Sequence, residues 1–135
     1  MKLRVVWIGK TKDPSMAKLC SDYTARIKHF LPIEIAEVKQ PKFDASDRLV
    51  ALDPRGKSWT SEGFAKFLQQ HMTSDPRRLT FIIGDYEGLS ETVKGRADVL
   101  WSLSPLTFTH DLARVLLLEQ IYRALTIIKN LPYAR

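Results

Sequence analysis

The last third of the chain, residues 101–135, constrains the fold most, because a short polar loop there leads into a long apolar helix. Residues 102–109 are mostly small or polar, and either Thr109 or Asp111 can cap the first free backbone N–H groups of the helix. Apolar residues then recur with a helical period at Leu112, Val115, Leu116, Ile121, Ala124, Leu125 and Ile128. The exposed backbone amides of a loop that leads into such a buried helix are the first place to look for a ligand.

Two further leucines, Leu117 and Leu118, widen this apolar stripe beyond what a helix on one core surface requires. A helix with apolar residues over most of its circumference is normally covered on more than one side. We therefore expect a sheet to cover one side of this helix and a second subunit to cover another.

The residues before this region alternate between strand-like and helix-like patterns. Predicted strands cover residues 3–9, 33–38, 48–53, 79–83 and 100–103. Helices are expected to begin at Asp13 with Pro14 in first position, at Ser58 or Thr60 after a turn at residues 54–57, and at Ser90. This alternation predicts an α/β fold with a mostly parallel sheet and helices on both faces, in a single domain of 135 residues.

The connection between the second and third predicted strands is unusually short. Only residues 39–47 lie between them, whereas a parallel crossover usually needs a dozen or more residues. Two explanations are open: the strands form an antiparallel hairpin, or a connecting segment is absent at this point.

Charge and composition limit the classes of partner. The formal net charge of +6 favours a polyanion such as nucleic acid, and five basic residues are candidate phosphate contacts: Lys10, Lys12, Lys57, Arg77 and Arg78. Cys20 is the sole cysteine, so an intramolecular disulfide is excluded. No apolar stretch is long enough for a membrane span, and the first residues run into a strand rather than a signal peptide, so we expect a cytoplasmic protein.

Three predicted strand ends meet at the carboxyl edge of the sheet, where open α/β sheets bind ligands. They are residues 52–53, 84–88 and 103–108. Gly84 and Gly88 either close a tight turn or let the backbone approach a ligand, and they match no dinucleotide or triphosphate motif. Arg114 either pairs with a surface acid or directs its forked donors at a phosphate or carbonyl. The three histidines share no metal-ligand spacing, so no metal is expected.

Several segments together resemble the bacterial ribosomal RNA large-subunit methyltransferase H family, small enzymes of the SPOUT class. They are residues 1–10, 52–53, 56–57, 61–63, 83–89, 102–110, 114–116, 119–124 and 132–133, and they span nearly the whole chain. The resemblance implies a deep trefoil knot near the C-terminus and a homodimer that builds each active site from both subunits. It also implies methylation, by S-adenosylmethionine, of N3 of a pseudouridine in large-subunit ribosomal RNA on assembled ribosomes.

The resemblance also assigns roles to individual residues. Backbone groups in the knotted loops would hold the cofactor at Leu52, Gly84, Leu103, Ser104, Pro105, Leu106, Thr107 and Phe108. The catalytic candidates are Arg114, which would stabilise negative charge on the base, and Tyr133 and Arg135, which would position base or phosphate.

The chain departs from the family pattern at two places. The family usually ends in Tyr-His-Lys or Tyr-His-Arg, whereas this chain has Ala134 in place of the histidine. The family also has a longer segment with a helix where this chain has residues 41–47, which favours a disordered loop left out of the sequence as written over a true deletion. Two alternatives stay open: a non-catalytic module that binds RNA on the ribosome, and a SPOUT methyltransferase that acts on transfer RNA.

Overall fold

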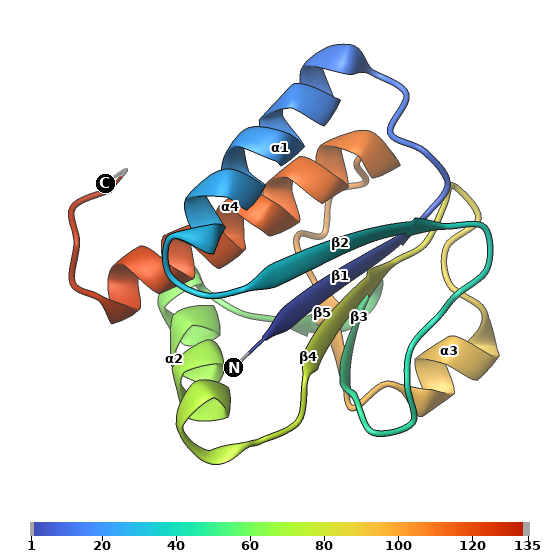
Figure 1. Ribbon diagram of the computed structural model, residues 1–135. Coiled ribbons are helices and arrows are strands. Elements are labelled where there is room, and N and C mark those ends of the chain that lie inside the picture. Colours follow the sequence, from blue (N-terminus) through green and yellow to red (C-terminus); the bar gives the residue numbers. More distant parts are fainter. Residues whose placement is uncertain (1, 134–135) are drawn as a thin grey trace.

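The computed structural model describes residues 2–133, which form one parallel sheet with helices on both faces (Figure 1). The strands are β1 (Leu3–Ile8), β2 (Ile33–Val38), β3 (Arg48–Ser58), β4 (Leu79–Ile83) and β5 (Val99–Ser102). The helices are α1 (Pro14–Lys28), α2 (Ser61–Ser74), α3 (Glu91–Arg96) and α4 (His110–Ile128). The strand order is β2-β1-β4-β3-β5, and every pair is parallel. The predicted α/β class and parallel sheet are confirmed.

Helix starts follow local capping chemistry. The Asp13 side chain accepts hydrogen bonds from the backbone N–H groups of Ser15 and Met16, with Pro14 in the first turn of α1. Thr60 caps α2, and Thr109 rather than Asp111 caps α4. Asp111 lies inside the helix, where its carboxylate has a different role that is described below.

The two faces of the sheet have separate apolar cores. Three helices, α1, α4 and α2, cover one face, and α3 lies on the other with the β2–β3 connection (Figure 1). Along β1, Val5 packs with the three-helix core, whereas Val6 packs with Ile82 and with Val93 of α3. Alternation of side chains along a strand explains how consecutive buried residues serve opposite faces.

Helix α4 lies between α1 and α2 over the sheet (Figure 1). Leu117 and Leu118 are both 0% exposed within their own chain, so neither residue needs a second subunit to cover it. That part of the argument for a dimer was wrong, because two neighbouring helices and the sheet already cover most of the α4 circumference. Leu112 and Leu116 are half-buried on the outward side. Within residues 2–133, no helix is both long and apolar enough to cross a membrane.

The β2–β3 connection is not a hairpin, so that explanation was wrong. Strand β2 is at the sheet edge, and β1 and β4 lie between it and β3. Residues 39–47 cross the second face without a helix, and Phe43 packs against the core that contains Val6 and Ile82. A loop with one aromatic residue thus covers the face, and no missing segment is needed to close the crossover.

The buried carboxylate of Asp47 anchors this connection to the neighbouring strand. Its oxygens accept hydrogen bonds from Arg78 Nε at 3.0 Å, Arg78 Nη2 at 3.0 Å, Thr80 Oγ1 at 3.2 Å and the Asp44 backbone N–H at 3.0 Å. Burial by itself would raise the pKa of Asp47, but these hydrogen bonds and the Arg78 charge outweigh it, so the pKa lies below its ordinary value.

We expect Asp47→Asn to lower the free energy of unfolding by about 3 kcal/mol, because it leaves the Arg78 guanidinium without its buried anion. Asp44→Asn is the matched control: Asp44 contacts the same arginine at 2.9 Å but is 71% exposed, so we expect a loss below about 1 kcal/mol. The Asp47 contribution is present above the ordinary aspartate pKa of about 3.9 and is lost as pH falls below it. Urea unfolding at pH 7 and pH 3 measures both effects; equal losses for the two variants at pH 7 would contradict the assignment.

Strand β3 is longer than predicted and contains a bulge. Leu52 and Lys57 both pair with Trp101, so residues 53–56 leave the ladder between them. The turn predicted at residues 54–57 therefore lies largely inside a strand. A Cβ at Gly56 would lie 2.5 Å from the Leu100 carbonyl oxygen, so only glycine fits where the chain rejoins β5.

Candidate functional site

A cavity of about 490 Å³ opens at the carboxyl ends of β3, β4 and β5. Its walls come from three segments, residues 52–54, 83–88 and 101–109, and from the first turns of α4. These are the three strand ends that were predicted to meet at this edge of the sheet. The cavity has the position and size expected of a small-molecule site in an open parallel sheet.

Seven of the eight predicted cofactor residues line this cavity. They are Leu52, Gly84, Leu103, Ser104, Leu106, Thr107 and Phe108. The eighth, Pro105, is not among the lining residues and is exposed on the loop. The structure therefore brings these seven residues together around one cavity.

The turn after β4 gives the cavity a backbone wall. A Cβ at Gly84 would lie 2.6 Å from the Gly88 carbonyl carbon, so a side chain does not fit between the two ends of the turn. Gly88 has a φ of +81°, which L-residues rarely adopt. Both glycines close a tight turn and also leave backbone exposed to the cavity. The two interpretations of Gly84 and Gly88, a tight turn and a backbone that a ligand can approach, are therefore compatible.

The rest of the lining is apolar with a few polar groups. Ile83, Trp101 and Phe108 supply apolar wall, and the titratable side chains are those of Asp53, Asp85, Tyr86 and His110. Asp53 lies 3.6 Å from Lys94 Nζ. The Ser104 hydroxyl accepts a hydrogen bond from the Leu106 backbone N–H at 3.0 Å and so shapes the 103–108 loop. Such a cavity suits a ligand with an aromatic part and a positive charge.

Arg114 is not in this cavity. Its side chain is 0% exposed, donating to the Ile8 carbonyl oxygen at 2.8 Å and to Thr11 Oγ1 at 2.9 Å. Its guanidinium carbon also lies 5.0 Å from the centre of the Trp7 ring. The expected contact between Arg114 and a substrate does not fit this arrangement, because the side chain faces the β1–α1 loop and not the cavity.

Asp111 completes the same junction. Its Oδ2 accepts from the backbone N–H groups of Lys12 at 3.0 Å and Asp13 at 2.9 Å, which joins the start of α4 to the start of α1. Burial acts to raise the pKa of Asp111, but these two hydrogen bonds and the neighbouring His110 and Arg114 together lower it below its ordinary value. Asp111 directly follows His110, which lines the cavity. The junction therefore helps to fix the start of α4 at the cavity.

We expect Arg114→Met to lower the free energy of unfolding by about 3 kcal/mol, because the Ile8 carbonyl and the Asp111 carboxylate lose buried partners. Arg26→Met is a suitable control, since that arginine is exposed on α1; we expect a change within about 0.5 kcal/mol. Thermal and urea unfolding measure the difference. An Arg114→Met protein as stable as the control would show that this junction contributes little.

Tyr133 lies at the opposite end of α4. Its hydroxyl is 3.1 Å from that of Tyr23, and its ring packs edge-on against Tyr122. The guanidinium carbon of Arg123 lies 5.1 Å from the centre of the Tyr133 ring, and Arg123 also pairs with Glu119 at 2.8 Å. Burial, followed by hydrogen bonding to neighbouring groups, raises the pKa of Tyr133, so the phenol stays protonated. Arg135 and Ala134 lie outside the described residues.

Arg123 and Tyr133 both line a separate cavity of about 550 Å³. Arg123 was not predicted as a site residue. It lies in the segment 119–124 that carries the family resemblance, but the helical pattern did not distinguish it from a surface arginine. His110 and Arg123 are 13 residues apart on α4, which corresponds to about 20 Å along the helix axis. Within one chain, the predicted cofactor loops and Tyr133 are therefore too far apart to act on the same atom.

The five predicted phosphate contacts differ in their surroundings. Arg77 pairs with Asp75 at 2.8 Å, and Arg78 with Asp47 and Asp44, so both are engaged within the chain. Lys57 lies over the Trp59 ring, 4.9 Å from its centre. Among residues 2–133, no acidic side chain lies within ion-pair distance of the remaining two, Lys10 and Lys12.

Comparisons with known proteins agree with this geometry. A family model described as "Predicted SPOUT methyltransferase" matches residues 40–134. The chain is 40% identical over 151 aligned residues to the ribosomal RNA large subunit methyltransferase H of Trichlorobacter lovleyi, covering 98% of this chain and 99% of that protein. The chain belongs to the SPOUT methyltransferase family. The resemblance found from the sequence is confirmed.

A second relative bears on the short β2–β3 connection of this SPOUT chain. The methyltransferase H of Coprothermobacter proteolyticus is 44% identical over 137 aligned residues, which cover 98% of this chain and 99% of that protein. The alignment with the T. lovleyi protein needs 151 positions, more than the 135 residues of this chain. The family therefore has longer and shorter members, and this chain is similar in length to the shorter one.

Solved structures show the same fold at low sequence identity. A probable methylase family protein from Haemophilus influenzae superposes with a TM-score of 0.63 at 9% identity, covering 98% of this chain and 70% of that one. The tRNA (m1G37) methyltransferase of Aquifex aeolicus superposes with a TM-score of 0.53 at 16% identity, covering 100% of this chain and 77% of that one. The SPOUT fold of this chain is thus supported by both sequence and structure.

Proposed function

We propose that this protein transfers a methyl group from S-adenosylmethionine to N3 of a pseudouridine in large-subunit ribosomal RNA, on the assembled ribosome. The observation that carries the proposal is the cavity at the carboxyl ends of β3, β4 and β5, because it gathers seven of the eight residues predicted to hold the cofactor. Relatives that are about 40% identical over the full chain are named ribosomal RNA large subunit methyltransferase H, which gives the substrate class.

The residues of the cavity fit this cofactor. Trp101, Ile83 and Phe108 offer apolar surface to an adenine ring, and the side-chain-free turn at Gly84 lets backbone groups approach a nucleoside. Asp85 offers negative charge to a ligand that carries a sulfonium and an ammonium, whereas Asp53 is already paired with Lys94 at 3.6 Å. When bound, the cofactor supplies an electrophilic methyl group, so the protein needs to position and orient the reactants rather than form a covalent intermediate.

We further propose that the active site is completed by a second copy of the chain. The outward stripe of α4 carries the half-buried residues Leu112, Leu116 and Arg123 and the exposed Ile127. If two α4 helices pack antiparallel with the twofold axis near Leu116, His110 of one subunit lies beside Arg123 of the partner subunit. This arrangement removes the separation of about 20 Å between the two ends of α4.

In this composite site, Tyr133 would orient the target base as a neutral hydrogen-bond donor, since its pKa is raised by burial. Arg123 lies against Tyr133 and would stabilise the negative charge that develops when the imide-like N3 loses its proton to solvent. Arg135 would contact base or phosphate. Arg114 would position the entrance of α4 through Asp111 rather than touch the substrate. The family usually has a histidine where this chain has Ala134, so a histidine at this position is not part of the proposed mechanism.

We also propose that the chain is a single domain with a deep trefoil knot, in which the segment leading to α4 passes through the loop formed by residues before it. The close approach of Gly56 to the Leu100 backbone is compatible with such threading. Pulling the two chain ends in a single-molecule experiment tests it. A knotted chain reaches a contour length shorter than 135 fully extended residues, and an unknotted chain reaches the full length.

The test of the activity is methyl transfer from labelled S-adenosylmethionine to ribosomes from cells that lack this protein, with calorimetric titration of the cofactor on the same preparation. We expect cofactor binding and label in one large-subunit pseudouridine. Since the proposed substrate is the ribosome, we propose that the protein acts in the cytoplasm. Binding without transfer to ribosomes, but with transfer to transfer RNA, would favour the second candidate substrate. Ribosome binding without any transfer would favour a non-catalytic module.

A further inference from the structure

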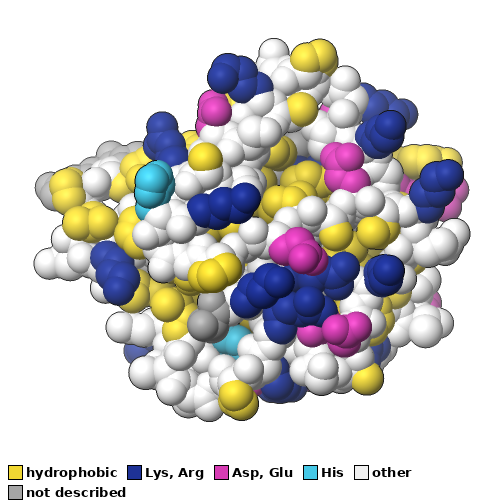
Figure 2. Space-filling model, in the orientation of Figure 1, with side chains coloured by type: hydrophobic (Ala, Val, Ile, Leu, Met, Phe, Trp, Pro, Cys, Tyr) yellow, Lys and Arg dark blue, Asp and Glu magenta, His cyan; other side chains and the backbone are white. Residues whose placement is uncertain are grey.

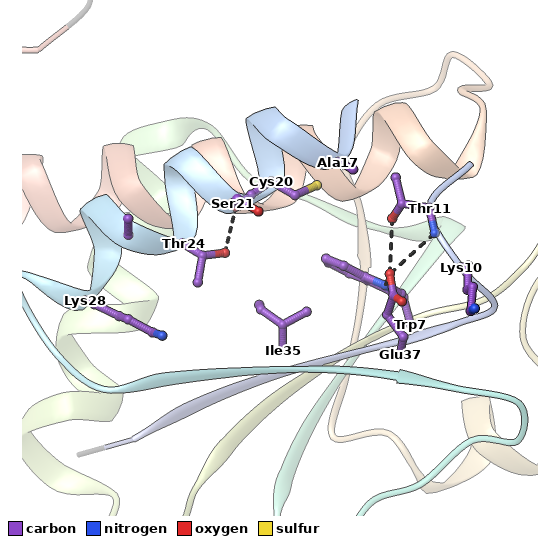
Figure 3. A pocket seen from close by; sticks show the side chains of 11 residues that line it. Trp7, Lys10, Thr11, Ala17, Cys20, Ser21, Thr24, Lys28, Ile35 and Glu37 are labelled. Atoms are coloured by element: carbon purple, nitrogen blue, oxygen red, sulfur yellow. Dashed lines mark hydrogen bonds between the residues drawn. The ribbon is translucent and has the colours of Figure 1, made fainter. Parts of the chain in front are cut away.

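A second open cleft, of about 800 Å³, lies between α1 and the edge of the sheet formed by β1 and β2 (Figure 3). Trp7 and Ile35 form its floor, and Ser21 and Thr24 of α1 lie along its wall. The cleft shares no lining residue with the cavity at the carboxyl ends of β3, β4 and β5. The fold leaves it open because α1 packs mainly against α4 and hardly touches β2.

Basic side chains stand at both ends of this cleft. Lys28 enters it from the last turn of α1, and Lys10 lies at the opposite end (Figure 3). The Gly9 backbone N–H donates to the Val38 carbonyl oxygen at 2.8 Å, so the exposed Lys39 leaves the sheet beside Lys10. Figure 2 shows basic side chains near both ends of the hollow below α1 and apolar side chains at its floor.

The charge of the chain is concentrated in this part of the molecule. Residues 1–39 contain eight Lys or Arg and four Asp or Glu, whereas the remaining residues contain 13 and 11. Among the acids near the cleft, Asp22 pairs with Lys18, and Asp13 caps α1. Most of the net charge of +6 therefore lies on β1, α1, β2 and their loops.

One acidic residue, Glu37, does line the cleft. Its Oε1 accepts hydrogen bonds from Trp7 Nε1 at 3.1 Å and from the Thr11 backbone N–H at 3.4 Å. The carboxylate thus fixes the Trp7 ring in the floor and the loop that carries Lys10. We assign it a role in shaping the Lys10 end rather than in contacting an anion.

We propose that this cleft binds a short single-stranded segment of the RNA substrate, with Lys10 and Lys28 contacting phosphates at its two ends. This inference rests on the proposed function, since it takes RNA as the substrate. Ala17 and Lys28 are 11 residues apart on α1, about 16 Å along its axis, which suits a strand of about four nucleotides. Ser21 and Thr24, which line the cleft, lie on a different side of α1 from Tyr23, which contacts Tyr122 of α4.

The chemistry of the lining suits single-stranded RNA better than the other occupants. The hydroxyls of Thr11, Ser21 and Thr24 can bind phosphate or ribose oxygens, and the two lysines neutralise phosphates. The Trp7 ring is 3% exposed, so it supplies a floor and not a stacking platform. Recognition through backbone contacts is therefore expected to depend on salt and to show little sequence preference.

The test compares two double charge reversals with the same change in net charge. Lys10→Glu/Lys28→Glu reverses the positive charge at both ends of the cleft. Lys18→Glu/Lys66→Glu reverses the charge of two exposed lysines outside it. We measure binding of undermethylated large ribosomal subunits as a function of salt, the KM for methyl transfer to them, and titration of S-adenosylmethionine. A 4-thiouridine-labelled rRNA hairpin is crosslinked to the wild-type protein.

For Lys10→Glu/Lys28→Glu we expect RNA affinity at least about tenfold weaker, and a salt slope smaller by about 1.4 because two phosphate contacts are lost. Cofactor affinity is expected to be unchanged, and crosslinks are expected on α1 or β2. Similar losses in both variants would overturn the proposal, as would a change of oligomeric state confined to the cleft variant, which would make the cleft a subunit contact. A wild-type protein that binds RNA through the cleft but transfers no methyl group would contradict the proposed function alone.

Discussion

Gly84→Ala is expected to lower the affinity for S-adenosylmethionine by at least about 100-fold, which corresponds to about 2.7 kcal/mol. The added Cβ would lie 2.6 Å from the Gly88 carbonyl carbon and 2.8 Å from its oxygen, both of them backbone atoms. The 84–88 turn must therefore shift, and this turn forms one wall of the candidate cofactor cavity. Calorimetric titration of the cofactor measures the loss.

Gly95→Ala is the matched control for Gly84→Ala. Gly95 lies in α3, and a Cβ there meets no atom within 4 Å, so the same substitution adds a methyl group to open space. We expect unchanged cofactor affinity and stability equal to or slightly above that of the wild type. A folded Gly84→Ala protein that binds the cofactor as tightly as Gly95→Ala would place the cofactor elsewhere.

A heterodimer of one Gly84→Ala subunit and one Tyr133→Ala subunit is expected to have about half of the wild-type activity, although each homodimer is expected to lose at least about 100-fold. The reason is the position of the two groups at opposite ends of α4. If each site takes its cofactor loops from one subunit and Tyr133 from the other, the heterodimer keeps one intact site. Two affinity tags allow the heterodimer to be purified after co-expression, and labelled methyl transfer measures its activity.

The reciprocal heterodimer provides the control. It has both substitutions in one subunit and a wild-type partner, so a composite arrangement leaves no intact site and activity is lost. If the active site instead lay within one chain, the outcomes would be reversed: the doubly substituted heterodimer would keep half of the activity, and the other would keep none. A monomeric wild-type protein in sedimentation would contradict both the dimer and the composite site.

Local features of the fold could be predicted because they depend on neighbouring residues. The Asp13 cap followed by Pro14, the continuous apolar run of β4 and the polar loop before α4 each express chemistry within a few positions. The alternation of these elements then determined the α/β class. The family resemblance identified the cofactor loops, because it depends on the type of residue at particular positions and not on their distances in space.

Contacts between distant parts of the chain could not be read from the pattern. Leu117 and Leu118 have the same apolar character whether a neighbouring helix or another subunit covers them, and only the packing of α1 and α2 decided this. Arg114 has the spacing of a residue that faces a ligand, yet the β1–α1 loop, about 100 positions earlier, covers it. The bulge at residues 53–56 likewise depends on pairing with β5.

The sequence by itself determined the class of fold, the family and the three loops that form the cavity, because these follow from local periodicity and residue identity. Tertiary structure alone decided which charged groups are free, since Arg78 is engaged by Asp47 whereas Lys10 and Lys28 stand at the ends of an open cleft. It also decided that the cofactor loops and Tyr133 lie at opposite ends of α4. The physical reason is that burial and ion pairing depend on which segments meet in space, and a linear pattern contains no such distances.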